Sequence, residues 1–431
     1  MKKAALHNLG CKVNAYETEA MQELLEQNGY EIVPFKDDAD VYIINTCTVT
    51  NMADRKSRQM LHRAKKMNPN AIIVATGCYV QTQEGSVDES IDIIIGNNRK
   101  KDLVEILDAY EEQRNKDHEN KLREVIDINH THEYEELHLS HTAEHTRAYI
   151  KVQDGCNQFC SYCIIPFARG RVRSRKREDV VAEVKTLASK GYKEVVLTGI
   201  HLSSYGVDTG DSLLSLILAV HDIDGILRIR LGSLEPRIVT EEFAKTISAL
   251  EKMCPHFHLS LQSGCNATLQ RMNRRYSAEE YFEKCELLRK YFDHPALTTD
   301  VIVGFPMESE EEFEESKNFV DRVNFYETHI FKYSQRHGTK AAVMEGQIPD
   351  QVKTERSAQL IELGERKQKE YEKRLIGQTV EVLMEEAVTI DGEVYQVGHT
   401  KEYVKVGLKT EENLSNKLIH VKIESPLQII H

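Results

Sequence analysis

The sequence has no apolar run long enough to cross a lipid bilayer, and its first residues, MKKAALHNLGCKVN, lack the apolar segment of a signal peptide. It has no excess of positive charge either, because the formal net charge is -13. That balance argues against a surface coated with basic residues for gripping nucleic acid. A local basic patch is still compatible with it, because charges more than roughly 10 Å apart are largely screened. We expect a cytoplasmic protein without a membrane partner.

Paired cysteines of the secretory kind are also missing. The nine cysteines are an odd number, spread over a chain of 431 residues without secretory features. Disulfides are therefore not expected, and metal binding or reactive thiols are the better interpretation. The 40% of hydrophobic and 29% of charged residues describe a soluble globular protein, and the length predicts about two to three domains.

The first part of the chain alternates short apolar runs with helical patterns. The run VYIIN is continuously apolar, as a buried parallel strand requires. The predicted strands are Ala4–Leu9, Val41–Asn45, Ala71–Ala75 and Ile91–Ile95, and the predicted helices are Tyr16–Asn28 and a basic one over Ala53–Met67. This alternation predicts a doubly wound α/β domain over residues 1–113.

The next segment, residues 114–141, is charged and rich in histidine. Its composition predicts a linker with little core of its own. Metal binding by these histidines is the alternative, but their irregular spacing and acidic neighbours favour a solvated connector.

A second alternating series spans residues 142–370. Its predicted strands are Ala148–Val152, Glu194–Leu197, Leu227–Leu231, His256–Leu261, Thr298–Val303 and Tyr326–Phe331, with helices such as Ser277–Tyr291 and Ser309–Arg322 between them. Six βα units predict a partial (β/α)6 barrel, smaller than the closed form with eight units.

The last part of the chain, residues 371–431, has a different pattern. A long polar helix around Asp350–Ile376 leads into it. Short alternating segments follow, at Gln378–Met384, Glu393–Val397, Tyr403–Val406 and Leu418–Ile423, with a turn at Asp391-Gly392. We therefore expect the chain to be an α/β multidomain protein that ends in a small β-barrel.

Three cysteines stand close together in GCNQFCSYC, directly after a predicted strand: Cys156, Cys160 and Cys163. Thiolates at this C-x3-C-x2-C spacing can hold one face of a four-iron cluster, and no fourth cysteine lies nearby. One iron would then stay open to bind another molecule. A structural zinc site, which would need a fourth cysteine or histidine nearby, and three unrelated thiols are the alternatives.

Three further cysteines each follow a predicted strand of the first domain: Cys11, Cys47 and Cys78. The carboxyl ends of parallel strands share one edge of the sheet, so these thiols can converge on one site. Taken alone, such cysteines are more often buried small apolar residues. Cys254, Cys265 and Cys285 share no such position, and Cys285 is expected in a helix and in the core.

The GCNQFCSYC segment resembles the radical S-adenosylmethionine superfamily. The resemblance implies a 4Fe–4S cluster on Cys156, Cys160 and Cys163, whose open iron chelates S-adenosylmethionine for cleavage to a 5′-deoxyadenosyl radical. It implies further cofactor contacts at Tyr162 and at strand ends, namely Thr198, Gly199, Ser233, Glu235, Gln262, Gly304 and Phe305. Each of these residues also has a plain interpretation as part of a turn or the core.

With both cysteine groups, the chain is similar over nearly its whole length to the methylthiotransferases. The segments GCKVN, NTC and TGC resemble that family's motifs for an auxiliary cluster, and the terminal β-domain resembles its RNA-binding TRAM module. The resemblance implies a second 4Fe–4S cluster on Cys11, Cys47 and Cys78 that delivers sulfur. It also implies an electron donor such as flavodoxin or ferredoxin, and the tRNA anticodon loop as a partner.

Three substrates occur in that family: isopentenyladenosine in tRNA, threonylcarbamoyladenosine in tRNA and an aspartate of a ribosomal protein. The segments TGIHLSSYG, SLQSGCN and FKYS are similar to the threonylcarbamoyladenosine branch, the MtaB type, which implies methylthiolation of C2 at tRNA position 37. The base of that branch carries a carboxylate, so a cationic or polar pocket is expected. An iron–sulfur or zinc protein that binds RNA without chemistry is the alternative from another class.

Two local features bear on these expectations. In an extended run, Arg169, Arg171, Arg173 and Arg175 would project to one face, which favours contact with RNA phosphates over the alternative of a solvated charge run. The family usually has Gly-Phe-Pro-Gly-Glu, whereas Met307 here replaces the second glycine. If that glycine needs a positive φ, the local turn must differ.

Overall fold

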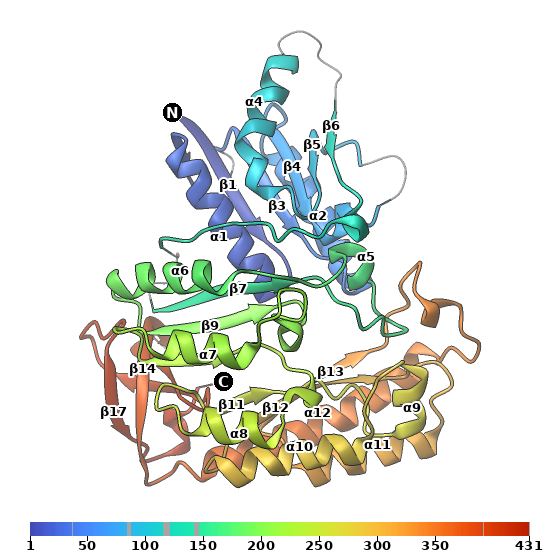
Figure 1. The fold of residues 1–431 in the computed structure, drawn as a ribbon, viewed down its shortest axis with the longest axis vertical. Coiled ribbons are helices and arrows are strands. Elements are labelled where there is room, and N and C mark those ends of the chain that lie inside the picture. Colours follow the sequence, from blue (N-terminus) through green and yellow to red (C-terminus); the bar gives the residue numbers. More distant parts are fainter. Residues whose placement is uncertain (37, 84–87, 115–120, 142–145, 391, 431) are drawn as a thin grey trace.

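The computed structural model describes residues 1–36, 38–83, 88–114, 121–141, 146–390 and 392–430. Figure 1 shows an N-terminal α/β domain on top, a core with strands and helices below it, and a β-domain on the lower left. Among the described residues, no helix combines the length and the apolar character that crossing a membrane requires.

The N-terminal domain is a parallel six-stranded sheet with the strand order β2-β1-β3-β4-β5-β6. Its strands are β1 (Lys2–Asn8), β2 (Tyr30–Ile32), β3 (Val41–Thr46), β4 (Ile72–Gly77), β5 (Ile93–Ile95) and β6 (Leu122–Glu124). Its helices are α1 (Lys12–Gln27), α2 (Asn51–Met67), α3 (Cys78–Gln81) and α4 (Leu103–Arg114). α1 and α4 bury apolar side chains against one face of the sheet and α2 does so against the other. The predicted doubly wound domain is confirmed.

The segment expected as a solvated linker is largely packed against the protein. β6 lies within it and pairs with β5, so it adds the last strand to the N-terminal sheet. Farther along, Leu137 and Leu139 are buried beside Tyr16, whose hydroxyl donates to the Leu137 carbonyl at 2.6 Å. The expectation of little core was wrong because a few apolar residues among many charged ones are enough to anchor a segment. Residues 115–120 and 142–145 lie outside the described part.

The core contains six parallel strands, as predicted: β7 (Arg147–Asp154), β9 (Glu194–Gly199), β10 (Arg228–Leu231), β11 (His256–His258), β12 (Ala296–Val303) and β13 (Glu327–Lys332). A short strand, β8 (Arg173–Ser174), pairs antiparallel with β7. Single bridges from Ile229 to Met253 and from Leu234 to Leu259 join the β10 and β11 sides into one curved surface. The predicted partial barrel is therefore present.

The core helices cover the outer face of these strands. They are α5 (Ile165–Arg169), α6 (Arg177–Ser189), α7 (Leu213–His221), α8 (Glu241–Ser248), α9 (Asn266–Arg271), α10 (Ala278–Tyr291), α11 (Glu310–Val323) and α12 (Asp350–Lys373). Alternate strand residues such as Phe257, Leu297 and Val301 pack with them in the largest apolar cluster. The other residues of each strand point to the inner face of the barrel, because side chains alternate along a strand.

The C-terminal domain is an antiparallel four-stranded sheet with the order β16-β15-β14-β17. Its strands are β14 (Thr379–Ile390), β15 (Glu393–Thr400), β16 (Lys405–Lys409) and β17 (Leu418–Lys422). At the expected turn, Gly392 has a φ of +83°, while Asp391 lies outside the described residues. This sheet is tied to the barrel by Arg228 and Arg230, which donate to the carbonyls of His399 and Lys401 at 2.8 and 2.9 Å.

The N-terminal domain contacts the partial barrel on both sides of its opening. On one side, α1 packs against β7 and β9. On the other, Arg336 in the loop after β13 donates to Thr48 and forms an ion pair with Asp54 at 2.7 Å. Figure 1 shows this domain seated over β7. The strand ends that carry the cysteines therefore lie at the junction of the two domains.

Candidate functional site

The three N-terminal cysteines, here called the auxiliary thiol group, lie together at one edge of the sheet. Cys11 precedes α1, Cys47 follows β3, and Cys78 begins α3 directly after β4. A Cβ placed on Gly10 would lie 3.1 Å from the Cys47 sulfur, and Gly10 has a φ of +111°. Glycine is therefore required there, because the backbone before Cys11 passes directly over the Cys47 thiol.

Burial, together with the neighbouring thiols of Cys78 and Cys11, raises the pKa of Cys47 to about 11. Such thiols ionise only when positive charge compensates them. The structure supplies a positive charge at Cys78, whose sulfur accepts a hydrogen bond from Arg169 Nε at 3.2 Å. Asn97 Nδ2 is a second donor to this sulfur, at 3.8 Å.

The central thiol group, Cys156, Cys160 and Cys163, occupies the loop after β7. Its turn is made by Phe159, which has a φ of +50°, and by the Cys163 amide, which donates to the Cys160 carbonyl at 3.0 Å. Burial raises the pKa of Cys156 to about 11 and that of Cys163 to about 12. As in the auxiliary thiol group, a guanidinium donates a hydrogen bond to one sulfur: Arg274 Nη1 donates to Cys160 Sγ at 3.2 Å.

The arginine run does not form the exposed basic face expected for phosphate contact. α5 ends at Arg169, so the run is not extended throughout, and Arg169, Arg173 and Arg175 are 0% exposed. Only Arg171 is exposed, with its guanidinium over the Phe159 ring at 4.6 Å from the centroid. The phosphate assignment is therefore wrong for the three buried arginines, whose charges are already compensated by carboxylates of the protein.

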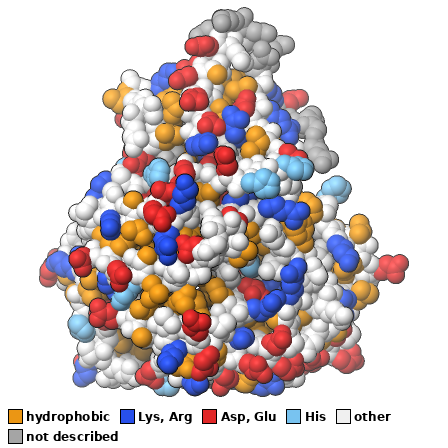
Figure 2. Space-filling view, viewed as in Figure 1, with side chains coloured by type: hydrophobic (Ala, Val, Ile, Leu, Met, Phe, Trp, Pro, Cys, Tyr) orange, Lys and Arg blue, Asp and Glu red, His pale blue; other side chains and the backbone are white. Residues whose placement is uncertain are grey.

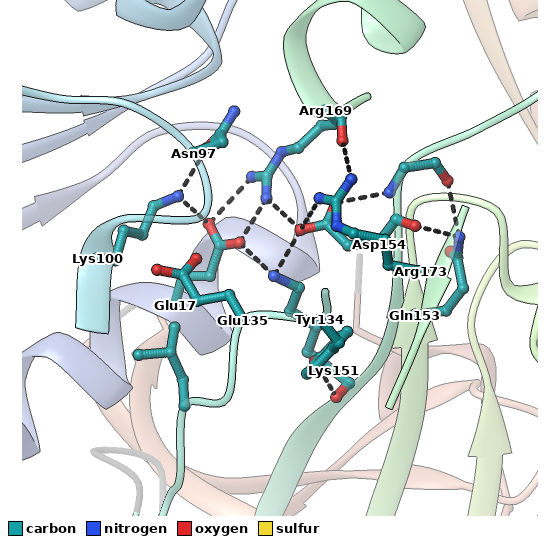
Figure 3. A network of polar contacts seen from close by, with 12 residues as sticks. Glu17, Asn97, Lys100, Tyr134, Glu135, Lys151, Gln153, Asp154, Arg169 and Arg173 are labelled. Atoms are coloured by element: carbon teal, nitrogen blue, oxygen red, sulfur yellow. Dashed lines mark hydrogen bonds and ion pairs between the residues drawn. The ribbon is translucent and has the colours of Figure 1, made fainter. Parts of the chain in front are cut away.

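Figure 3 shows these carboxylates in a buried network across the domain junction. Glu17 of α1 pairs with Arg169 and, at 2.7 and 3.2 Å, with Lys151 and Lys100. Asp154 pairs with Lys151 at 2.7 Å and with Arg169 at 3.3 Å. Arg175 lies apart from these residues and pairs with Glu183 at 2.8 Å and with Glu136 at 3.2 Å.

The charge balance of this network fits an anionic sulfur at Cys78. Ion pairs join the four cations Lys100, Lys151, Arg169 and Arg173 to the carboxylates of Glu17 and Asp154, and the Glu135 carboxylate lies close to Lys151. A thiolate at Cys78 would supply the fourth negative charge, in direct contact with Arg169. Since metal-bound cysteines are thiolates, the auxiliary thiol group fits an iron–sulfur cluster better than three neutral thiols.

The expected cofactor contacts lie at the same ends of the barrel strands as the central thiol group. Tyr162 stands edge-on to Phe305, with ring centroids 6.4 Å apart. Phe305 is fully buried and packs in a small cluster with Met272, Tyr333 and Ala341, so its side chain belongs to the core.

The contacts from β9 and β10 lie on the next strand ends. Thr198 and Gly199 end β9, and the exposed Ser233 and half-buried Glu235 follow β10. Burial raises the pKa of Glu235, and Arg274 lowers it, which places this carboxyl near the guanidinium that contacts Cys160. After Gly199, His201 has a ring Nε2 with no partner among the described residues. An unsatisfied polar atom at this strand end fits a polar cofactor there.

The last two expected contacts have left-handed backbones. Gln262 has a φ of +73° and is 8% exposed, while Gly304 has a φ of +70° and donates its amide to Glu308 at 2.6 Å. Farther along this turn Met307 has a φ of +63°. The turn therefore keeps the positive φ of the usual glycine, and the expected change of geometry is not seen.

Arg274 was not recognised from the sequence. Arg274 lies in MNRRYS, where nothing distinguishes it from its neighbour Arg275, and only the fold brings it to Cys160. Cys285, in contrast, is buried in α10, as predicted.

The site combines two groups of three thiols, and one guanidinium contacts a sulfur of each group. One group lies on a partial parallel barrel and the other on the α/β domain that precedes it. This combination defines a radical S-adenosylmethionine enzyme with an auxiliary cluster site. The model of the radical SAM superfamily matches residues 150–320, and that described as uncharacterized protein family UPF0004 matches residues 3–96. The chain is 42% identical to the threonylcarbamoyladenosine tRNA methylthiotransferase MtaB of Bacillus subtilis, over 98% of this chain and 94% of that protein. It is 43% identical to the Aquifex aeolicus protein of the same name, over 94% and 98% of the two chains. The chain belongs to the MtaB family of methylthiotransferases.

A solved structure supports the fold alone. The radical S-adenosylmethionine methyltransferase TsrM from Kitasatospora setae, with cobalamin and a 4Fe–4S cluster bound, aligns with a TM-score of 0.60 at 17% identity. The alignment covers 80% of this chain and 77% of that chain. The arrangement of a preceding α/β domain on a partial barrel therefore occurs in another radical enzyme.

Proposed function

We propose that this chain transfers a methylthio group to C2 of N6-threonylcarbamoyladenosine at position 37 of tRNA. The observation that carries the proposal is the full-length similarity, at 42% and 43% identity, to relatives named for that activity, together with two separate groups of three thiols. Neither group has a fourth cysteine, since Cys254, Cys265 and Cys285 are buried elsewhere in the core domain.

In this proposal Cys156, Cys160 and Cys163 hold the cluster that binds S-adenosylmethionine, and Cys11, Cys47 and Cys78 hold the auxiliary cluster. When bound, these groups supply radical hydrogen abstraction and a transferable sulfur. Arg274 and Arg169 stabilise the thiolates of Cys160 and Cys78 through hydrogen bonds of 3.2 Å each. Contacts to S-adenosylmethionine come from Tyr162 and from the strand ends, namely Thr198, Gly199, Ser233, Glu235, Gln262 and Gly304.

The partners follow from the same proposal. The substrate is the anticodon loop of tRNA, and a low-potential donor such as flavodoxin or ferredoxin supplies electrons. A cytoplasmic location, where tRNA is available, belongs to the proposal as well. The C-terminal sheet is the TRAM-like module that would contact RNA, and its contacts would rest on shape and a few residues because the domain is not strongly basic.

Nucleoside mass spectrometry of tRNA from cells with and without the protein tests the proposal. We expect the methylthiolated form of threonylcarbamoyladenosine to vanish without the protein while its precursor accumulates. A second candidate base is dimethylallyladenosine, because a relative named for its methylthiolation, from Thermoanaerobacter pseudethanolicus, is 37% identical over 97% of this chain. Loss of methylthio-dimethylallyladenosine instead would assign that base.

Anaerobic reconstitution separates the enzyme from an RNA-binding protein without chemistry. Two 4Fe–4S clusters correspond to about eight irons per chain. We expect that content together with release of 5′-deoxyadenosine from S-adenosylmethionine. Bound zinc without cleavage of S-adenosylmethionine would support the binding protein.

A further inference from the structure

Two histidines and an aspartate lie side by side on the inner face of the partial barrel. They are His258 of β11, Asp300 of β12 and His329 of β13, three parallel strands that Figure 1 shows next to one another. Asp300 is directly opposite His329, and His258 is opposite Thr298, two positions before Asp300 on the same face. Alternate residues of these strands, such as Val301, pack outward in the largest apolar cluster, so the three polar side chains project inward.

The spacing of these side chains suits a metal ion. One ligating atom of each lies within 4.8 Å of those of the other two, and His258 Nε2 is 3.3 Å from an Asp300 oxygen. Two ligands held about 2.0–2.1 Å from zinc at the tetrahedral angle are themselves roughly 3.3–3.4 Å apart. His258 and Asp300 therefore have the spacing of two ligands of one ion. The side chain of His329 is 44% exposed, so it is free to rotate toward them.

A neighbouring hydroxyl orients the His258 ring. Its Nδ1 lies 3.0 Å from Thr298 Oγ1. When Nδ1 carries the proton and donates it to this hydroxyl, Nε2 keeps the lone pair that a metal needs. Metal-binding histidines usually have such a partner on their other ring nitrogen. Thr298 therefore favours metal binding through Nε2, which is the nitrogen next to Asp300.

Two carboxylates lie at this place, those of Asp300 and Glu327, the latter 3.8 Å from His329 Nδ1. In the described ranges of the chain, neither carboxylate forms an ion pair with a lysine or an arginine. A bound cation would compensate their charge, which neutral histidines do not. A plain ion pair between His258 and Asp300 is the alternative, but it gives His329 no role.

We propose that His258, Asp300 and His329 bind a divalent transition-metal cation such as zinc on the inner face of the barrel. Imidazole and carboxylate ligands suit such ions, and three protein ligands leave one position of a tetrahedral ion open. Water or an oxygen of a bound substrate would fill that position. The site goes beyond the proposed function, because neither group of three thiols supplies a ligand to it.

Zinc is the probe for the test, since elemental analysis distinguishes it from cluster iron. The full-length protein with both clusters reconstituted is dialysed anaerobically against buffered zinc, and zinc and iron per chain are measured by inductively coupled plasma mass spectrometry. We expect the wild type to bind one zinc that Asp300→Asn and His329→Gln each lose. Thr298→Val removes only the supporting hydroxyl and should weaken the zinc affinity by about 10- to 100-fold. Iron should stay at the wild-type content, since none of these residues belongs to a thiol group.

His62→Gln is the matched control. His62 pairs with Asp88 at 2.6 Å, and no third ligand joins this pair among the residues that the structure describes. This variant should keep the zinc affinity of the wild type. X-ray absorption at the zinc edge should show imidazole nitrogen and oxygen ligands at about 2.0–2.1 Å. Sulfur ligands at about 2.3 Å would place the zinc on cysteines and overturn the site. Equal zinc affinity in the wild type, Asp300→Asn and His329→Gln would overturn it as well.

Discussion

The side chain of Arg169 joins a sulfur of the auxiliary thiol group to two buried carboxylates. Its Nε donates to Cys78, while its other nitrogens pair with Glu17 and Asp154. A planar guanidinium can make these contacts simultaneously, and a lysine ammonium cannot reproduce their geometry. The residue therefore connects the position of Cys78 to the junction between the domains.

Arg169→Lys should keep the charge of the network but weaken binding of the auxiliary cluster. We expect iron at this site to fall well below the wild-type content of about four per cluster, with an altered electron paramagnetic resonance signal of the reduced cluster. The measurement is made in a background with alanine at Cys156, Cys160 and Cys163, so that only auxiliary iron is counted. The control is Arg171→Lys, at an exposed neighbouring arginine, which should keep the wild-type iron content and signal. A wild-type iron content and signal in Arg169→Lys as well would show that the contact to Cys78 has no effect on the cluster.

Met307 has a backbone conformation that normally favours glycine. Its φ of +63° costs a residue with a side chain roughly 1 kcal/mol relative to glycine. Met307→Gly should therefore raise the thermal unfolding midpoint by a few degrees at most, and Met307→Val should lower it because a branched side chain is more strained there. Differential scanning calorimetry distinguishes these outcomes, and a lower midpoint for Met307→Gly would contradict the argument.

The six cysteines were recognisable from the sequence because each follows a strand or lies in a short motif. The arginine run was misjudged for a different reason. Its partners, Glu17 and Asp154, are fixed by tertiary structure, and no local pattern reveals that α1 of another domain carries a carboxylate to Arg169. A run of like charges has the same appearance in a sequence whether it faces phosphates or buried carboxylates.

Most secondary-structure elements could be predicted because their apolar patterns are strong. The predicted strand Val41–Asn45 is one residue shorter than β3, and the predicted helix Asp350–Ile376 is three residues longer than α12. β6 was missed because its three residues, Leu122–Glu124, include only one apolar side chain. Its place in the sheet comes from backbone pairing with β5, which the side-chain pattern does not record.

The α2 helix offers exposed positive charge where the arginine run does not. Its exposed basic residues are Arg55, Lys56, Arg58, Arg63 and Lys66. None of them forms an ion pair with another described residue, and Asp54 is the one acidic residue of the helix. α2 follows Cys47 after a short loop, so a polyanion on its surface would lie beside the auxiliary thiol group. Figure 2 shows acidic side chains along the lower edge of the molecule, away from this domain.

Replacing Arg55, Arg63 and Lys66, which lie along one side of α2, with glutamine should weaken tRNA binding and reduce its dependence on salt. Each phosphate contact contributes roughly 0.7–0.9 to the slope of log affinity against log salt concentration, so the slope should fall by about 2. Filter binding between low and physiological salt measures it. The control variant carries glutamine at three exposed lysines of the core helices, Lys185, Lys245 and Lys373. Equal slopes in both variants would exclude α2 from the RNA contact.

At the scale of the whole chain, the α/β domain and the barrel depend on each other. The barrel is not closed between β13 and the β7 side, where the short β8 is the last strand, and the N-terminal domain contacts both sides through α1 and Arg336. The buried network in Figure 3 crosses the same junction, and breaking a buried ion pair by removing one partner costs about 3–5 kcal/mol. The two thiol groups are thereby held on either side of one junction, although Cys156 lies 78 positions after Cys78 in the sequence.

This arrangement predicts that losing a cysteine from one thiol group affects the reaction differently from losing a cysteine from the other. Cys160→Ala removes a central ligand and should abolish cleavage of S-adenosylmethionine, with about four irons retained at the auxiliary site. Cys47→Ala should retain cleavage and a similar iron content at the central site but lose methylthiolation, because no sulfur is delivered. Both variants are measured on the same anaerobically reconstituted preparations, as iron, 5′-deoxyadenosine and methylthiolated nucleoside per chain.

Cys285→Ala is the matched control, since its thiol is buried in α10 outside both groups. Full methylthiolation by Cys47→Ala would show that the sulfur comes from elsewhere, and the auxiliary thiol group would then need a structural explanation.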